Sequence, residues 1–289
     1  MRKDVALPAL ALAGGTAGFF LRRWQLASAY VPETGLFVHG APATLLLLAL
    51  AGALTLMFLL LTRCEGGPDD FLPAFGCPET GQLTVLTAAG LLLMAAGALG
   101  LREGLSSLQL WRAYPELYQL STPGSQLIAA VLCLPAGLGI VLMGRMSCRR
   151  ELDNWACRLA PFPPLAGLVW LFYVHLKHGT EPVLMKYGFE LFAVLLLALA
   201  HYDSAGFLFG RPHPWRTAFL TLTGAAAGIT SLADQTGLFT AAATLACSLS
   251  ALALGRALLR NTFGPPWPKR LMSERMPPTE EDNMSEHDA

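Results

Sequence analysis

Charged residues are scarce in this chain, and their scarcity argues against a soluble fold. Only 14% of the 289 residues are charged, whereas 54% are hydrophobic and the mean hydropathy is +0.48. An ordinary globular domain carries roughly 25% charged residues, which it needs to cover its surface. The 20 basic and 20 acidic residues also cancel. The chain therefore lacks the net positive charge that would indicate a nucleic-acid partner, and we expect no such partner.

Several signatures of catalysis and metal binding are absent as well. The chain contains no G-x-x-x-x-G-K-[ST] loop, no H-E-x-x-H pair and no G-x-S-x-G elbow, which mark ATPases, metalloproteases and α/β-hydrolases. His175 and His178 have no further ligands at metal-binding spacing, and the spacing of Cys64 and Cys77 matches no common zinc motif. We therefore expect no metal and no cofactor, and we lean against an enzyme.

What the chain has instead is a series of long apolar runs. A membrane-spanning helix needs about 20 such residues. Eight runs approach this length, at residues 5–21, 42–62, 82–101, 125–144, 162–176, 183–201, 217–233 and 238–258. They are continuous rather than alternating, which favours helices over a β-barrel. The sequence predicts an all-α integral membrane bundle of about eight transmembrane helices in a lipid bilayer, spanning residues 1–260.

The basic residues predict an orientation for this bundle. With eight spans, one side of the membrane receives 14 of the 20 lysine and arginine residues and the other side receives six. The six are Arg22, Arg23, Arg102, Arg112, Lys177 and Lys186. The positive-inside rule then places both termini in the cytoplasm. Arg22 and Arg23 lie on the minority side, where we interpret them as interfacial anchors beside Trp24. They also disfavour a cleaved signal peptide, since the region after its apolar core is normally short and polar.

Three segments outside the spans carry further predictions. Residues 101–118 are amphipathic and form either an interfacial helix or a connecting loop. Residues 261–289 are rich in proline and end in acidic residues, which predicts a disordered cytoplasmic tail. This tail and the basic loop 145–158 are the candidate surfaces for a protein partner. Within the spans, Gly14–Gly18 and Gly224–Gly228 are GxxxG pairs, which we interpret as packing faces inside the monomer.

The sixth predicted span holds the principal candidate site. Glu190 lies about two turns inside it, and an ionisable residue at such a place usually faces the bundle interior or water. At 100° per residue Lys186, Glu190 and His201 form one stripe, although Glu190 and His201 are about 16 Å apart along the axis. Such a stripe could line a polar path. The favoured interpretation is local, with Lys186 paired to Glu190 and His201 ending the helix.

Four more polar residues are secondary candidates. His175 and His178 precede the sixth span, and Asp203 follows it. Asp234 lies in the turn between the last two spans, where an aspartate typically caps the next helix or bonds the turn.

Two stretches of the chain carry a resemblance. One comprises residues 14–26 and 32–36, and the other comprises residues 187–190 and 201–207 and ends near Arg211. Together they resemble a group of uncharacterised multi-pass membrane proteins from anaerobic gut-type bacteria, over about a quarter of the chain. The resemblance implies a bacterial plasma membrane and carries over no catalytic or binding residue.

Three functional hypotheses remain open at this point. A small-solute transporter is slightly favoured, because many proteins with this number of spans move something, and it requires a water-accessible cavity that reaches Glu190 and its neighbours from one side. A non-enzymatic scaffold or sensor would act through protein partners, and it predicts a bundle packed dry around Glu190 with exposed apolar or basic faces at the loops and tail. An intramembrane enzyme would require catalytic groups to converge from different spans.

Overall fold

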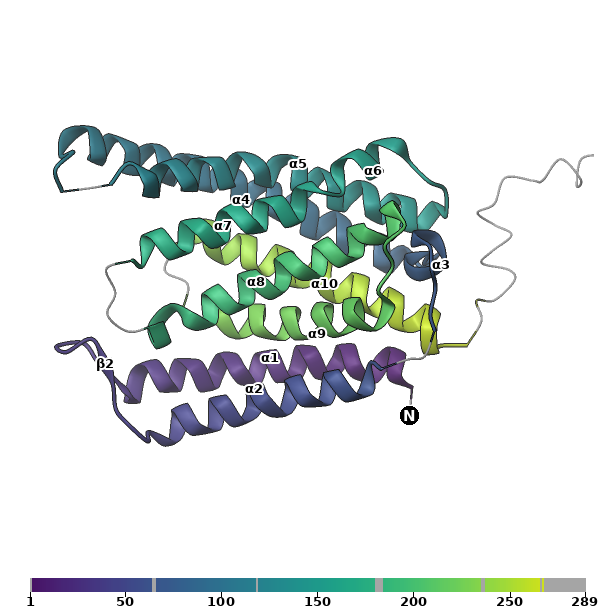
Figure 1. Ribbon diagram of the computed structural model, residues 1–289, viewed down its shortest axis with the longest axis horizontal. Coiled ribbons are helices and arrows are strands. Elements are labelled where there is room, and N and C mark those ends of the chain that lie inside the picture. The colour runs from purple at the N-terminus through teal and green to yellow at the C-terminus, as the bar shows by residue number, and fades with distance from the viewer. Residues whose placement is uncertain are drawn as a thin grey trace, which may run out of the picture.

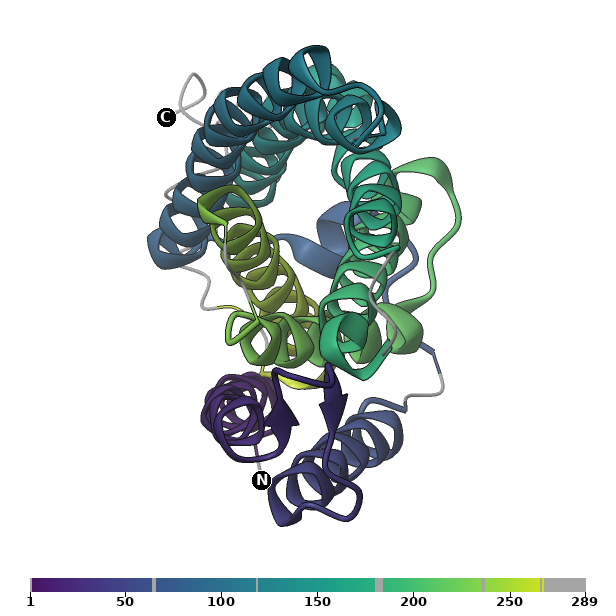
Figure 2. The ribbon, with the colours of Figure 1, turned by 90° about the vertical axis from the view of Figure 1, so that its left-hand side faces the viewer.

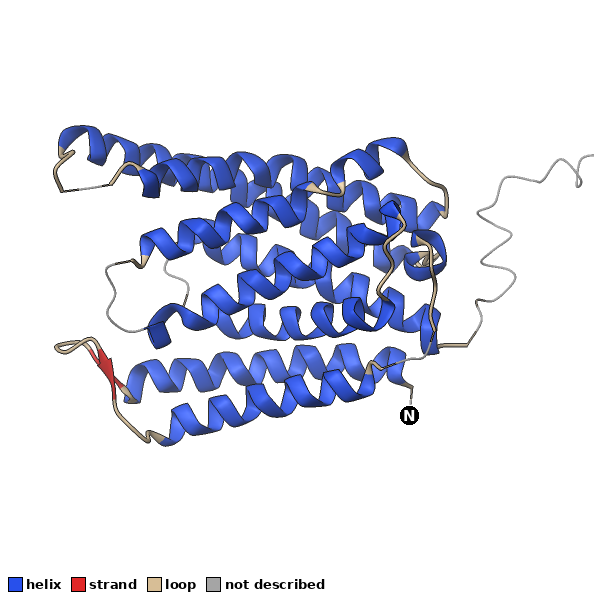
Figure 3. Cartoon of the chain, viewed as in Figure 1, coloured by secondary structure: helices blue, strands red, loops and turns tan. Residues whose placement is uncertain are grey.

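The chain folds into long helices that run side by side along one axis (Figure 1). The structure is a computed structural model that describes residues 2–63, 66–117, 119–179, 184–234, 237–265 and 267, with residues 184 and 185 described by their backbone alone. The helices are α1 (Lys3–Ser28), α2 (Pro42–Leu61), α3 (Phe71–Phe75), α4 (Thr80–Ala113), α5 (Ser121–Arg149), α6 (Asn154–Leu159), α7 (Phe162–Lys177), α8 (Leu184–Gly206), the 3₁₀ helix η1 (Phe207–Phe209), α9 (Pro214–Ser231) and α10 (Leu238–Phe263). Strands β1 (Tyr30–Val31) and β2 (Leu36–Phe37) pair as a short antiparallel hairpin, drawn in red in Figure 3.

The predicted all-α membrane bundle is confirmed. Within the described residues, seven segments are helical, long and apolar enough to cross a membrane: α1, α2, α4, α5, α6 with α7, α8 with η1, and α10. The chain is therefore a multi-pass helical membrane protein. Each of these helices satisfies its own backbone hydrogen bonds, as the bilayer core requires.

Helix α9 occupies the position of the remaining predicted span, 217–233, but it is not among the seven segments that are long and apolar enough to cross a membrane. Its 18 residues extend about 27 Å, and it packs against α1, α2, α8 and α10. Twelve of those residues are buried by these neighbours. Its threonine hydroxyls bond to its own carbonyls, as Thr221 does to Thr217 and Thr230 does to Ala226. A helix enclosed by other helices needs little lipid-facing apolar surface, which explains the lower hydropathy.

The structure differs from both alternatives that the sequence left open for the segment 101–118. Residues 101–113 form neither a separate interfacial helix nor a loop, because α4 continues without a break to Ala113. The extension packs on α5 through glycines at seven-residue spacing. A Cβ atom on Gly97 would lie 2.7 Å from the Ala130 carbonyl oxygen, and one on Gly104 would lie 2.8 Å from Leu127 Cδ2. This spacing matches a left-handed crossing of two helices, so α4 and α5 stay in contact beyond the predicted span.

The two GxxxG pairs are confirmed as packing faces inside the monomer. A Cβ atom on Gly14 would lie 2.6 Å from Leu54 of α2, and one on Gly18 would collide with Thr230 of α9. Gly224 and Gly228 approach α8 and α10 in the same way. Viewed end-on in Figure 2, α1 and α2 lie on the opposite side of the molecule from α4 and α5, with α8, α9 and α10 between them.

Both described termini lie at one end of the bundle, which we call the terminal end; we call the other, which carries the β1–β2 hairpin, the hairpin end. At the terminal end, the Lys3 ammonium donates to the Leu61 carbonyl, and Asp4 pairs with Arg2 at 2.9 Å and Arg260 at 3.9 Å. This arrangement agrees with the prediction that both termini share one side of the membrane. The cytoplasmic assignment of that side stays a prediction.

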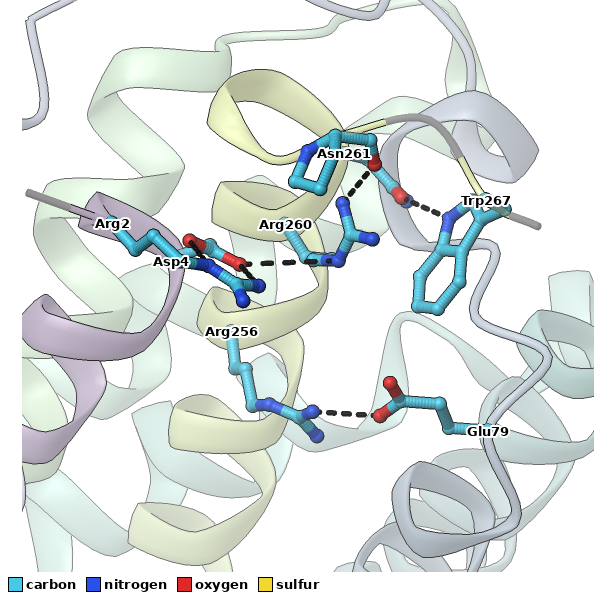
Figure 4. A network of polar contacts seen from close by, with 8 residues as sticks. Arg2, Asp4, Glu79, Arg256, Arg260, Asn261 and Trp267 are labelled. Carbon is cyan, nitrogen blue, oxygen red and sulfur yellow. Dashed lines mark hydrogen bonds and ion pairs between the residues drawn. The ribbon is translucent and has the colours of Figure 1, made fainter.

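The start of the predicted tail differs from the expected boundary. Helix α10 continues through residues 261–263, and the Trp267 indole N–H donates to Asn261 at 2.8 Å, while its ring packs on Arg260. Figure 4 shows these contacts beside the ion pair of Arg256 with Glu79, at 2.6 Å. Polar side chains therefore tie the end of α10 to its surroundings. The rest of the predicted tail, apart from Gly264 and Pro265, lies outside the described residues.

Candidate functional site

A fully buried arginine organises the hairpin end. Arg22, near the end of α1, has none of its surface exposed. Its Nε donates to Asp234 Oδ1 at 2.7 Å, and its two terminal nitrogens donate to Gln25 Oε1 at 2.5 Å and to the Lys186 carbonyl at 2.8 Å. Its guanidinium also lies 4.9 Å from the centre of the Phe189 ring. One side chain thereby joins α1, α8 and the turn that follows α9.

This finding corrects the interpretation of Arg22 as an interfacial anchor. Arg23 and Trp24 are exposed, as an anchor requires, but Arg22 points into the protein. Gln25 lies three residues later on the same helical face and is also buried. Its amide nitrogen donates to Thr44 of α2 at 2.8 Å. The polar face of α1 is therefore satisfied by neighbouring helices rather than by water.

Asp234 is the acidic partner of Arg22. It lies in the turn between α9 and α10, outside the membrane-spanning helices, and burial raises its pKa to about 6 because desolvation outweighs the attraction of Arg22. Its second oxygen, Oδ2, is buried without a hydrogen bond to any described residue. The predicted capping role is wrong: α10 begins after Gly237 with no side-chain cap there. The Phe239 N–H in its first turn instead donates to Glu103 of α4, at 3.3 Å.

Glu190 is buried, as its position in the span suggested. Its relative exposure is 3%, and its Oε2 lies 3.7 Å from Nε2 of His178, at the end of α7. Among the described residues, His178 is the one basic side chain within 4 Å of the carboxylate. The Glu190 Oε1 atom is buried without a hydrogen bond from any of them. The imidazole stacks on the Tyr187 ring with centroids 5.0 Å apart and a 7° tilt, which fixes its orientation.

Arg22, Asp234, Glu190 and His178 form one electrostatic unit, which we call the Arg22 cluster. The charge of Glu190 raises the pKa of Asp234, and His178 lowers it. Such influence requires proximity in a low-dielectric interior. The four groups come from α1, the α9–α10 turn, α8 and the end of α7. One arginine and one histidine thus face two carboxylates. Each carboxylate keeps one oxygen without a described donor.

The predicted stripe on α8 does not come together as one site. The Lys186 ammonium lies 5.3 Å over the Tyr30 ring, whereas its carbonyl serves Arg22. His201 is buried, with Nδ1 2.8 Å from the Leu197 carbonyl and Nε2 2.8 Å from the Ser250 hydroxyl. Since a carbonyl only accepts, Nδ1 carries a proton and Ser250 pairs with Nε2. His201 therefore links α8 to α10.

Two secondary candidates also lie away from the Arg22 cluster. Asp203 accepts two hydrogen bonds from Arg216, at 2.5 and 2.6 Å, which tie α8 to α9 near the terminal end. His175 is exposed and lines a groove between α7 and α8 with Leu168 and Phe172. Only Glu190, His178 and Asp234, among the predicted candidates, therefore share one site.

The described residues offer no group of three or more histidine, cysteine, aspartate or glutamate side chains that could hold a metal ion. Cys77 is a buried free thiol, and Cys64 lies outside the described residues. Sequence reasoning missed Arg22, Gln25 and Phe189. The available signal was the pair Arg22 and Gln25, two polar residues on one face at the end of an apolar helix. Comparisons with protein-family models, curated proteins and solved structures find no match to this chain.

Proposed function

We propose that the protein is a small-solute transporter of a bacterial plasma membrane, with both termini in the cytoplasm and the Arg22 cluster as its outward-facing solute site. One observation carries this proposal. Two buried carboxylates, Glu190 and Asp234, come from different elements, and each has one oxygen facing a basic side chain and one without a described donor. Structural ion pairs in membrane interiors normally satisfy both partners.

The chemistry of the Arg22 cluster indicates the class of solute. A buried acceptor without a donor costs about 1–3 kcal/mol, and more when it is charged. A solute with ammonium or guanidinium N–H groups would supply donors to Glu190 Oε1 and Asp234 Oδ2. It would also bring positive charge to a cluster in which Arg22 is the one permanent cation. We therefore propose a small cationic solute rather than an anionic one.

The surroundings of the cluster support movement as well as binding. The His178 side chain is 17% exposed, whereas that of Glu190 is 4% exposed, so the histidine separates the carboxylate from the solvent at the hairpin end. In the other direction, α9 and α10 bury a series of hydroxyl groups. Most of these bond to their own helix, but Thr223 Oγ1 has no hydrogen bond to a described residue. Buried hydroxyl groups of this kind offer polar partners to a charged solute within the bundle.

A non-enzymatic scaffold is the second candidate function. The segment 145–158 exposes two large apolar residues among its arginines, Leu152 and Trp155, which are 67% and 64% exposed. Exposed apolar residues among basic ones at the end of the bundle are typical of either a protein contact or a lipid surface. The proposed partner surface would therefore be this segment rather than the Arg22 cluster.

A thermal-shift screen tests the transporter proposal. The buried cysteines Cys77 and Cys133 become reactive to a fluorogenic maleimide on unfolding, which reports the melting temperature in detergent. The probes are methylamine, guanidine, putrescine, lysine, glucose and acetate at millimolar concentration. A cationic probe should raise the melting temperature of the wild type, since a ligand stabilises the state that it binds.

The variant Glu190→Gln should abolish this shift, whereas the control Glu79→Gln, which alters an ion pair at the terminal end, should retain it. The stabilising probe should then accumulate in proteoliposomes that contain the wild type and not in those that contain Glu190→Gln. Binding without uptake would exclude transport. A shift from acetate alone, or equal shifts in both variants, would exclude this site.

A further inference from the structure

A second site lies at the terminal end, about one bundle length from the Arg22 cluster. A cleft of about 620 Å³ opens between the start of α7 and the turn that joins α8, η1 and α9. Leu165 and Leu168 of α7 form an apolar wall in its lining, together with Phe209 of η1. Arg211 and Arg216 also line the cleft. The cleft therefore combines an apolar wall with a cationic rim.

The cationic rim of the cleft carries a net positive charge. Asp203 also lines the cleft, but both of its oxygens accept from Arg216, through Nε and Nη2. This fork neutralises the aspartate and leaves the Arg216 Nη1 group without a hydrogen bond to a described residue. Arg211 is exposed and lines the same cleft, so that the three charged groups sum to one positive charge. An anion can thus contact two guanidinium groups without meeting an unpaired carboxylate.

The aromatic residues around the cleft place it at headgroup depth. Tyr202, Phe209 and Trp215 are 54%, 55% and 41% exposed. Exposed tyrosine and tryptophan at helix ends mark the boundary between acyl chains and headgroups. Leu165 and Leu168 are exposed on the side of α7 that continues from this boundary towards the middle of the bundle. A ligand in the cleft would therefore place its polar part at the rim and its apolar part along α7.

We infer that this cleft binds one anionic phospholipid, with its phosphate between Arg211 and Arg216 and an acyl chain against Leu165 and Leu168. Charge complementarity and the apolar wall together favour a lipid over a free anion, because a free anion would leave the wall uncovered. Basic pockets between membrane helices commonly bind anionic headgroups in this manner. The inference does not depend on the transporter proposal, since the two sites share no residue.

Native mass spectrometry of the detergent-purified protein tests this inference. The probes are phosphatidylglycerol and phosphatidylcholine with identical acyl chains. One phosphatidylglycerol should bind about thirtyfold more tightly than phosphatidylcholine, since each of the two arginines contributes ~1 kcal/mol to binding of an anionic headgroup. The variant Arg211→Gln should weaken phosphatidylglycerol binding about fivefold by the same constant. Leu165→Trp, which fills the cleft, should weaken the binding of both lipids.

Arg158→Gln is the matched control. Arg158 belongs to α6 at the same end, where it packs on Trp155, and it does not line the cleft. An equal loss of binding in Arg158→Gln and Arg211→Gln would show a bulk charge effect and overturn the proposed site. Unchanged binding in Arg211→Gln and Leu165→Trp would overturn it too. Displacement of the lipid by equimolar inorganic phosphate would show a free-anion site instead.

Discussion

Replacing Arg22 with methionine should be among the most damaging single changes in the protein. Methionine replaces the side chain as far as the position of Nε and removes its charge and all of its donors. Asp234, the Gln25 side-chain oxygen Oε1 and the Lys186 backbone carbonyl would each lose a donor inside the protein. Breaking a buried ion pair by removing one partner typically costs 3–5 kcal/mol, because the other charge stays buried and uncompensated.

The loss of stability in Arg22→Met should depend on pH, and this dependence identifies the Asp234 carboxyl as its cause. Because burial already raises the pKa of Asp234 to about 6, loss of Arg22 would raise it further, and the carboxyl would neutralise itself by taking up a proton. The lower end of the range, about 3 kcal/mol, is therefore expected at pH 7.5. For a chain of this size that corresponds to a fall in melting temperature of roughly 6–12 °C. The difference in melting temperature between Arg22→Met and the wild type should shrink at pH 5, where the Asp234 carboxyl of the wild type is itself largely protonated.

The melting temperature by the cysteine-reactivity assay measures this effect, with Arg23→Met as the control. Arg23 is the adjacent residue and is exposed, so its replacement should change the melting temperature by no more than about 2 °C. The double variant Arg22→Met with Asp234→Leu should recover most of the loss, because an apolar pair of similar volume replaces the ion pair. Equal melting temperatures for Arg22→Met and Arg23→Met would refute the reasoning, and so would a double variant that is less stable than Arg22→Met.

The remaining predictions concern protonation, packing and orientation. As the pH falls from 7 to 4, the wild type should gain stability relative to Asp234→Asn. The reason is that Asp234 binds a proton near pH 6 in the folded state but only near pH 3.8 in the unfolded state. Melting temperatures of the two proteins that change in parallel with pH would contradict this. Gly18→Ala should lower the melting temperature, since the new methyl group collides with Thr230, whereas Gly52→Ala meets no atom within 4 Å and should be neutral or stabilising by up to ~1 kcal/mol. A variant that keeps Cys64 as its sole cysteine should react with a membrane-impermeant maleimide only after the cells are opened, and labelling in intact cells would reverse the predicted orientation.

The helices were largely predictable because each apolar run is a local property of the chain. The helix α4 extends beyond the predicted span 82–101, although Arg102, Glu103 and Arg112 interrupt the apolar run. The helix continues because glycines at seven-residue spacing keep it in contact with α5. Hydropathy reports affinity for lipid and carries no information about such contact. For the same reason, hydropathy underestimates how well α9 fits into the bundle, because α9 is enclosed by other helices.

The candidate site was predictable only in part, since its geometry depends on distant segments. Glu190 stood out because an acid within a span is costly. Its partner His178 lies on a different helix, and the sequence pattern favoured Lys186 instead. The contrast between Arg22 and Arg23 shows the limit most clearly. Adjacent residues on a helix point 100° apart, but no local feature indicates which arginine faces inward. That choice depends on Asp234, more than 200 residues away.

The position of the Arg22 cluster also bears on how a transporter of this shape could work. The cluster lies where α1 and α2 meet the helices α8, α9 and α10, and Figure 2 shows this junction between two parts of the molecule. Glycines line the same junction on α1, where Gly15 and Gly18 allow close approach to α9. Small residues permit one helix to shift against another with little steric cost, whereas the ion pair of Arg22 with Asp234 opposes such a shift. A cation that binds Asp234 would compete with Arg22 for its carboxylate and weaken that restraint. Under the transport proposal, solute binding and movement of α1 are therefore coupled through a single carboxylate, which predicts that Asp234→Asn binds the solute weakly while its α1–α9 junction loosens.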